Sequence, residues 1–268
     1  MIDYGKKNLL GIGINAVDYD AAVQRIVHAA KSKQCLGVSA LAVHGVMTGV
    51  LNRQHCYRLN ELEMVVPDGQ PVRWGLNLLY GLRLPDRVYG PNLALRVCER
   101  ATEEGLSVFL FGSQEGTLEK LKANLESRIS GIRIVGMCPS KFRRLDAREK
   151  QELVEQIRAS QADITLVGIG CPRQEVWAFE FRKQLQMPVL AVGAAFAFHS
   201  DELSQAPEWM QRNGLEWLYR LAAEPKRLWK RYVFLNPAYV LLLGMQKLGL
   251  YKLDSSRGIE PQEEILYG

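Results

Sequence analysis

The stretch VVPDGQPVRWG (65–75) combines a strand-like apolar run with a carboxylate. The run delivers Asp68 to its end, and Gly69 permits a sharp turn directly after it. A carboxylate in such a position can act as a general base when its surroundings tune its pKa. An Asp-Gly pair after a strand is more often a plain turn, so this segment alone does not establish a catalytic site.

A second segment, LPDRVYGPNL (84–93), carries a candidate phosphate ligand. Arg87 comes just before a turn and a helix that we expect to start near Pro91, where Asn92 follows. A guanidinium can hold a diphosphate or a carboxylate with forked geometry. The alternative, which this segment alone favours, is a surface arginine paired with Asp86.

A third segment, VGIGCPRQEVW (167–177), joins a glycine-rich turn to a helix start. Pro172 suits the first turn of a helix and leaves the loop before it, with Gly168 and Gly170, to face a ligand. Gln174 lies in that first turn and is a candidate site residue. Alternatively, Gln174 is solvated and its acidic neighbour only complements the helix dipole.

Small residues also end other apolar runs of strand length. They are FGS at 111–113, with Gly112 and Ser113, and VGAAF at 192–196, with Gly193 and nearby His199. In open parallel sheets, ligands bind beyond the carboxyl ends of strands, and small residues there let a phosphate approach closely. We therefore expect a nucleotide or phosphate ligand, although glycine at a strand end more often serves the turn alone. Neither a GxGxxG fingerprint after the first strand nor a GxxxxGK(S/T) loop is present, so NAD binding and a P-loop are unsupported.

The segment GLEWLYRLAAEPKRLWKRY (214–232) mixes aromatic and basic side chains, including Arg220, Arg227 and Arg231. Pro225 separates two helical pieces, and in the second the basic residues stack at i, i+4 beside an apolar flank. Such a helix suits an anionic membrane surface, and docking on the protein core by its apolar face is equally consistent with the pattern. Nucleic acid is not expected as a partner, because the basic residues are confined to this one region.

The sequence does not predict a metal site. Asp18-Tyr19-Asp20 resembles the Asp-x-Asp with which many sugar transferases hold a divalent metal, but its place before the first expected helix favours helix capping. The four histidines and five cysteines show no metal-ligand spacing. Scattered cysteines of odd number also argue against a disulfide framework and favour reduced thiols in the cytosol.

Apolar runs of strand length alternate with amphipathic runs of helix length over the first two hundred residues. Strands are expected at 9–14, 36–43, 63–69, 107–113, 132–136, 163–170 and 188–196. Repeated βα units with nearly continuous apolar strands predict a Rossmann-like α/β fold, in which a mostly parallel sheet carries helices on both faces.

After about residue 200 the strands stop, and helices interrupted by prolines take over. We place a boundary near 196–210, which separates an α/β core at 1–200 from a helical, basic-aromatic appendage at 201–268. Residues 212–252 carry eight Lys or Arg and two Glu, a net charge of +6 against +5 for the whole chain, so the basic character belongs to the appendage. No apolar run reaches the roughly 18–20 residues of a spanning helix, so we expect a soluble or peripheral protein.

Taken together, these motifs resemble one family. VVPDG, DRVYGPNL, FLFGS, VGIGCPRQE, VGAAFAF and QAPEWMQRNGLEWLYRLAAEPKRLWKRY occur in the order seen in the WecB/TagA/CpsF glycosyltransferases (glycosyltransferase family 26). The resemblance runs from about residue 8 to residue 240. Each motif is weak alone, but the ordered set is specific, above all its C-terminal part.

The resemblance implies an activity. Members of this family transfer a sugar, with inversion and without a bound metal, from a UDP-sugar to a membrane-bound polyprenyl-diphosphate-linked saccharide. By resemblance we expect a UDP-sugar-dependent hexosyltransferase of bacterial surface or exopolysaccharide synthesis, peripheral at the cytoplasmic face of the inner membrane. It would need no cofactor, since the UDP-sugar is a substrate. Whether it forms a homo-oligomer stays open.

The resemblance also implies roles for individual positions. Asp68 matches the proposed general base, Arg87 the arginine of an RVxG motif near the substrate phosphates, and Gln174 a site-lining glutamine. Basic positions of the appendage, which in the family touches the membrane and helps close the site, correspond to Arg220, Arg227 and Arg231. The candidate donor- or acceptor-binding residues are Gly69, Asn92, Gly112, Ser113, Gly168, Gly170, Gln174, Gly193, His199, Arg220, Arg227 and Arg231. Arginines and helix N-termini would neutralise the departing diphosphate.

Three positions depart from the family pattern. Ala42 stands where the family usually has Asn, Ala197 replaces an acidic residue, and Gln205 replaces an arginine. The VHxVM and QAP motifs are what we expect of a branch that makes exopolysaccharide repeat units, in which the sugar is often glucose or a uronic acid. Two alternatives stay open: a non-catalytic membrane-recruited scaffold of polysaccharide assembly, and a nucleotide-sugar-modifying enzyme.

Overall fold

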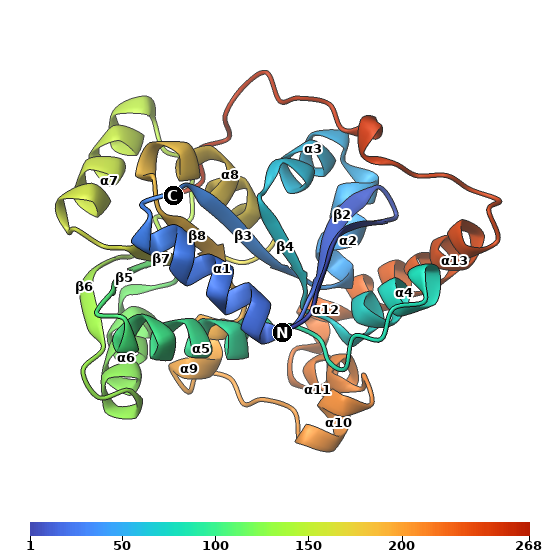
Figure 1. Cartoon of the computed structure of the whole chain (residues 1–268), viewed down its shortest axis with the longest axis horizontal. Helices are drawn as coiled ribbons and strands as arrows, with labels where there is room; N and C mark the ends of the chain where they lie inside the picture. Colours follow the sequence, from blue (N-terminus) through green and yellow to red (C-terminus); the bar gives the residue numbers. More distant parts are fainter.

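The computed structural model describes the backbone of residues 1–268 and every side chain except those at positions 227 and 231. Six parallel strands form the central sheet in the order β4-β3-β8-β7-β5-β6 (Figure 1). They are β3 (Leu36–Leu41), β4 (Met64–Pro67), β5 (Ser107–Phe111), β6 (Arg133–Cys138), β7 (Ile164–Val167) and β8 (Pro188–Ala191). All strands except the edge strand β6 are buried throughout, which accounts for their apolar sequences. The predicted Rossmann-like α/β class is confirmed.

Helices cover both faces of this sheet (Figure 1). One face carries α1 (Tyr19–Lys31), α5 (Gly90–Glu103), α6 (Glu115–Arg128) and α9 (Ala195–His199). The other carries α2 (Val43–Leu51), α3 (Arg53–Glu61), α7 (Ala147–Ala159) and α8 (Arg173–Leu185). Successive residues of β5 alternate between the two cores: Leu110 packs against the first set of helices, and Phe111 stacks on Trp177 of α8 with ring centroids 4.5 Å apart.

Short polar side chains fix the starts of several helices. The Asp18 carboxylate caps α1 by accepting a hydrogen bond from the Ala21 N–H at 2.9 Å, whereas Asp20 is exposed. The capping role that the sequence favoured for this Asp-x-Asp motif is therefore confirmed. Asn52 caps α3 in the same way through the His55 N–H, and this helix was not expected from the sequence pattern.

The N-terminal strand differs from the expectation. Instead of one strand over 9–14, two strands form an antiparallel hairpin separate from the parallel sheet. They are β1 (Asp3–Leu9) and β2 (Ile12–Val17). Leu10 and Gly11 form the turn with positive φ angles of 55° and 87°, as a two-residue hairpin turn requires. Because Leu10 is itself buried, the turn was hidden inside an apolar run.

The sheet contains a switch in connectivity that matters for ligand binding. Strands β3 and β8 are neighbours, but the helix after β3, α2, lies on one face and the helix after β8, α9, lies on the other. The chain therefore diverges beyond the carboxyl ends of these two strands and leaves a crevice between them. Open α/β sheets bind their ligands at such a point.

The segment after α9 is built of short helices beyond the carboxyl ends of the strands (Figure 1). They are α10 (Glu208–Arg212), α11 (Glu216–Ala223), α12 (Pro225–Lys230), the π-helical turn η1 (Arg231–Leu235) and α13 (Asn236–Lys247). Helix α13 packs on α4 (Gln70–Tyr80), with Tyr239 buried and its hydroxyl donating to the Pro71 carbonyl at 2.9 Å. The last helix therefore shares the hydrophobic core of the sheet domain.

The last twenty residues, which include the short 3-10 turn η2 (Ser255–Arg257), run back over the core. The chain passes α3 and reaches α8, where the Glu180 carboxylate accepts hydrogen bonds from the N–H groups of Ile265 and Leu266 at 2.8 and 2.9 Å. Figure 1 shows this segment crossing the molecule from α13 to the C-terminus. The tail thus fastens the end of the C-terminal helices to the opposite side of the core.

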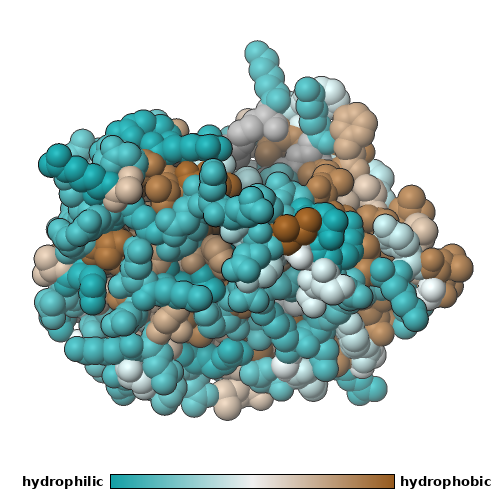
Figure 2. Space-filling model, turned by 90° about the horizontal axis from the view of Figure 1, so that it is seen from above, coloured by the Kyte–Doolittle hydropathy of each residue, from teal (hydrophilic) through white to brown (hydrophobic). Residues whose placement is uncertain are grey.

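Hydrophobic residues gather on the surface at one end of the molecule. Figure 2 shows them at the end where α4 and α13 lie in Figure 1. The most exposed of these on α4, η1 and α13 are Trp74, Leu78, Val233, Phe234, Val240 and Leu241, with exposed fractions of 41 to 65%. We call this set the apolar end patch. In the part of the chain that the structure describes, every helix is too short or too polar to cross a membrane.

Candidate functional site

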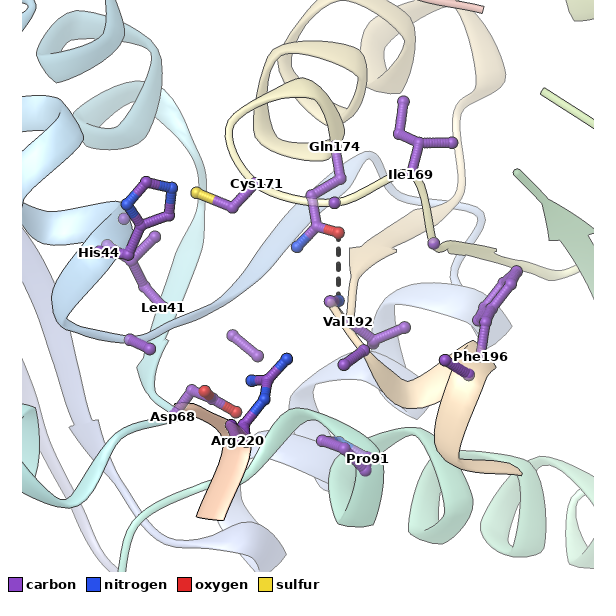
Figure 3. Close-up of a pocket in the computed structure, with 18 of the residues that line it drawn as sticks. Leu41, His44, Asp68, Pro91, Ile169, Cys171, Gln174, Val192, Phe196 and Arg220 are labelled. Atoms are coloured by element: carbon purple, nitrogen blue, oxygen red, sulfur yellow. Dashed lines mark hydrogen bonds between the residues drawn. The ribbon is translucent and has the colours of Figure 1, made fainter. Parts of the chain in front are cut away.

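A cleft of about 770 Å³ lies beyond the carboxyl ends of β3, β7 and β8 (Figure 3). Its floor consists of the turns after these strands, with Leu41 and Ala42, residues 168–171 and residues 192–194. The C-terminal helices also contribute side chains to the lining of the cleft. They are Arg220, Leu228, Lys230, Phe234 and Leu235. This volume falls within the range of roughly 300–1,000 Å³ typical of small-molecule sites. This cleft lies at the crevice predicted from the strand connectivity.

Asp68 lies at the boundary between this cleft and a second cavity of about 90 Å³. Strand β4 carries it to the sheet edge, and its Oδ1 accepts a hydrogen bond from the Gly90 N–H at 2.6 Å. Burial raises the pKa of Asp68 to about 6, against the opposing effects of Arg87 and of this hydrogen bond. A carboxylate with such a pKa is ionised at neutral pH and is more basic than an ordinary aspartate. It is therefore suited to accept a proton during a reaction.

Arg87 lies in a buried cluster beside the second cavity. Its guanidinium donates to Glu216 Oε2 at 2.6 Å and to Gln211 at 3.2 Å, and lies 4.1 Å from the centroid of the Tyr89 ring. The Tyr89 hydroxyl donates to Glu216 Oε1 at 3.0 Å. Because Arg87 is only 6% exposed, it is not the surface arginine paired with Asp86 that the segment alone favoured. Arg87 instead joins the core to α11.

Gln174 is buried at the start of α8 with its amide held on both sides (Figure 3). Its Oε1 accepts from the Gly193 N–H at 3.2 Å, and its Nε2 donates to Glu175 at 3.0 Å. Glu175 is fully buried and also accepts from the Ser39 hydroxyl at 3.4 Å; burial raises the pKa of this carboxyl. Gln174 is thus a fixed part of the cleft wall rather than a solvated side chain.

Gly168 allows the two sides of the floor to meet. A Cβ atom at this position would lie 2.5 Å from the ring of Phe196, a distance that real Cβ atoms do not reach. Phe196 of α9 therefore packs directly on the backbone after β7. The glycine at this strand end serves close packing under the cleft as well as the turn.

The other candidate residues fall into groups according to their position. Those that line the main cleft are Ser113, Gly168, Gly170, Gln174, Gly193 and Arg220, and Gly69 lines the second cavity with Arg87 and Arg220. Asn92, Gly112 and His199 line neither cavity. His199 Nε2 is 2.8 Å from the Pro91 carbonyl oxygen, and Asn92 is exposed. The side chains of Arg227 and Arg231 lie outside the described residues.

The site includes three further residues, which the sequence pattern did not single out. His44, near the start of α2, lines both cavities and faces Cys171 in Figure 3. Tyr89 lines the main cleft, and Glu216 lines the second cavity. A position shortly after a strand end was the available signal for His44. Glu216 gave none, because an acidic residue early in a helix is usually a dipole partner.

The charged side chains at the cleft favour an anionic ligand. Arg220 and Lys230 line it, and the Arg220 guanidinium lies beside Asp68 in Figure 3 and 5.8 Å from the ring centroid of Phe198. Within the described residues, His, Cys, Asp and Glu side chains form no group of three or more that could hold a metal ion. Two cations and a partly buried carboxylate line the same cleft, so it offers groups that can bind a phosphate and a group that can accept a proton.

Residues 7–253 match the protein family described as "Glycosyl transferase WecG/TagA/CpsF family". The matched range includes the whole sheet, both cavities and the helices from α10 to α13. The ordered motifs identified in the sequence resemble the same family.

Proposed function

The chain belongs to the WecG/TagA/CpsF family of glycosyltransferases, and from this premise we propose that it transfers a sugar with inversion from a UDP-sugar to a polyprenyl-diphosphate-linked saccharide. The observation that carries the proposal is Asp68, a carboxylate whose pKa is raised to about 6 where two cavities meet. The family supports glycosyl transfer, and the position of Asp68 supports a single displacement with one general base. A place in bacterial exopolysaccharide synthesis is part of the proposal.

In this mechanism the UDP-sugar occupies the main cleft and the acceptor hydroxyl enters through the second cavity. Asp68 takes the hydroxyl proton while the oxygen attacks the anomeric carbon. The bond from that carbon to the diphosphate breaks, and its electron pair leaves on UDP. Attack from the side opposite to UDP inverts the anomeric configuration. Arg220 and Lys230 offset the charge on the leaving diphosphate, so the proposal includes transfer without a metal cofactor.

The proposed reaction is tested by measuring UDP release from a panel of UDP-sugars, with and without a lipid-linked saccharide acceptor. We expect release that requires the acceptor, favours one donor and persists in excess EDTA. Consumption of a UDP-sugar without acceptor would indicate a nucleotide-sugar-modifying enzyme. If the protein turns over none of the donors but still binds membranes, it would be a scaffold.

We assign the apolar end patch to contact with the cytoplasmic face of the membrane. The patch lies partly on the C-terminal helices, whose exposed Lys226 and Lys230 add positive charge. Apolar side chains that enter the headgroup region, together with lysines near anionic lipids, are sufficient for reversible peripheral binding. This arrangement would bring a lipid-linked acceptor to the second cavity, which Trp217 and Tyr232 line.

Placing two carboxylates in the patch should weaken membrane binding without changing catalysis. For Val240→Asp/Leu241→Asp we expect binding to anionic vesicles to fall by roughly tenfold or more, because apolar contacts are lost and negative charge is added. The bound fraction is measured by co-sedimentation, and kcat on a short soluble acceptor should stay within about twofold of wild type, since neither residue lines a cavity.

The matched control is Phe142→Asp, which puts a carboxylate at another exposed apolar residue, 47% exposed, in the segment before α7. Equal loss of vesicle binding in the control and in the patch variant would contradict the assignment of this patch.

A further inference from the structure

Glu216 is a buried charged residue of the appendage. It is 9% exposed, and its two partners, Arg87 and Tyr89, are 6% and 4% exposed. Each of its carboxylate oxygens accepts one hydrogen bond from the core, at 2.6 Å from Arg87 and at 3.0 Å from Tyr89. A buried ion pair is stable only when its geometry and additional hydrogen bonds offset the loss of hydration. Here both oxygens of the carboxylate are satisfied by residues of the sheet domain.

The position of Glu216 on α11 connects this cluster to the cleft. Glu216 and Arg220 are four residues apart, so they lie on the same side of the helix. Glu216 binds the core, and Arg220 lines both cavities. Whatever holds Glu216 in place therefore also sets the position of Arg220 above the cleft.

The Arg87 guanidinium faces two carboxylates. It is in direct contact with Glu216, and it also interacts electrostatically with Asp68. Burial alone would lower the pKa of Arg87, but Glu216 and Asp68 raise it above its ordinary value, so the side chain stays charged. A buried guanidinium that loses one carboxylate partner gains by pairing with the other. The choice of partner decides how basic Asp68 is.

We propose that Glu216 is a positioning residue of the active site, which docks α11 on the core through Arg87 and Tyr89 and keeps the Arg87 guanidinium from pairing with the base Asp68. The inference rests on the proposed function. It couples the basicity of Asp68 to docking of α11, because the same helix brings Glu216 to Arg87 and Arg220 to the cleft. Transfer to water or to a wrongly placed hydroxyl would then be suppressed until the site is closed.

The electrostatic consequence has a definite sign. Arg87 lowers the pKa of Asp68, Glu216 raises it, and Arg220 lowers it less than Glu216 raises it. The charged and titratable groups that face Asp68 from the surrounding elements are His44 of α2, Arg87 and Tyr89 before α5, and Glu216 and Arg220 of α11. When only the Glu216 charge is removed, Arg87 is no longer neutralised. A carboxylate near an uncompensated arginine typically loses roughly one to three pKa units.

The test uses Glu216→Gln in the full-length protein, because this change keeps the size of the side chain and removes its charge. We measure kcat of UDP-sugar-dependent transfer against pH. We expect the acidic midpoint to move down from about 6 by about one unit or more, and maximal kcat to fall about tenfold as the base weakens. Limited proteolysis of residues 200–235 should become faster, and this readout does not depend on activity.

Three further variants make the result decisive. Glu216→Asp keeps the charge and should keep the midpoint near that of wild type. Arg87→Gln/Glu216→Gln removes both charges of the buried ion pair, so it should fold and return the midpoint to the wild-type value or above it. Glu208→Gln removes an exposed carboxylate of α10 whose partner is Arg212 at 3.1 Å, and should change neither the midpoint nor the proteolysis rate.

Two outcomes would overturn the inference. One is a lowered kcat in Glu216→Gln with an unchanged midpoint, which would make Glu216 structural only. The other is an unchanged proteolysis rate, which would show that Glu216 does not dock α11. If wild type transfers no sugar from any donor, the proposed function fails instead, and the proteolysis result still decides the docking.

Discussion

Asp68→Asn is expected to lower kcat by about two orders of magnitude or more, the usual contribution of a general base. An amide in this position cannot take the proton of the acceptor hydroxyl. The KM for the UDP-sugar should change little, because most of the cleft that would hold the donor is lined by other residues. Near-wild-type kcat in this variant would refute the assignment of Asp68 as the base.

The pH dependence of the wild-type enzyme follows from the same carboxylate. With the pKa of Asp68 raised to about 6, kcat should be constant at neutral pH and fall as the pH drops through 6, where the base becomes protonated. The residual rate of Asp68→Asn should lack this acidic limb. Asp20→Asn, at an exposed position that lines neither cavity, is the matched control and should retain both the rate and the pH profile.

Asp68→Asn should also increase the stability of the folded protein. This result would distinguish a loss of catalysis from a loss of folding. A carboxyl whose pKa is higher in the folded protein than in the unfolded chain destabilises the fold at pH values above its folded pKa. This penalty disappears below the unfolded pKa, near 3.8. At pH 7.5, Asp68→Asn should therefore melt at a higher temperature than wild type, with a gain on the order of 1–2 kcal/mol after allowance for contact with solvent at the cleft. At pH 3.5 the two proteins should melt alike.

The parallel sheet was predictable because its strands carry an unmistakable pattern. Residues of β5 and β7 are buried on both faces, so each strand appears in the sequence as a nearly continuous apolar run before an amphipathic helix. The hairpin turn at Leu10 and Gly11 was not predictable from that pattern, since a buried residue occupies one of its two turn positions. A turn favours glycine or a polar residue, whereas burial favours an apolar one. At position 10 burial determined the residue type.

Residues of the candidate site were predictable from the sequence only where they follow the end of a strand. Asp68 and Gln174 follow strand ends, and parallel strands bring their carboxyl ends together whatever lies between them in sequence. The pairing of Arg87 with Glu216 joins residues 129 positions apart through a helix whose docking no local pattern specifies. For the same reason, sequence could not show that His199 turns to the Pro91 carbonyl instead of the cleft.

Arg220→Ala is expected to lower kcat by about 10²–10³-fold, comparable to the removal of a single transition-state donor in other enzymes. The diphosphate gains negative charge as the bond to the sugar breaks, so a fixed cation at the cleft acts mainly on the transition state. Arg220 comes from α11, is partly buried and lines both cavities. In this low-polarity setting its charge is screened less than that of an exposed lysine.

The charge distribution also predicts how the loss divides between kinetic constants. UDP carries the full charge of the leaving group, so the inhibition constant of UDP should rise in Arg220→Ala more than the KM of the UDP-sugar. Arg220→Lys should recover part of the rate, because an ammonium supplies charge without the planar fork of a guanidinium. Lys230→Ala should cost less than about tenfold, because the lysine is exposed and solvent screens its charge.

Arg212→Ala is the matched control, since Arg212 is an exposed arginine of α10 that pairs with Glu208 and lines neither cavity. Its kcat should stay within about twofold of wild type. If Arg220→Ala and Arg212→Ala behaved alike, the cation that offsets the leaving diphosphate would have to be another group. A large effect confined to Arg220 would instead place the C-terminal helices inside the catalytic unit, because the core alone would hold the base without the charge that its reaction requires.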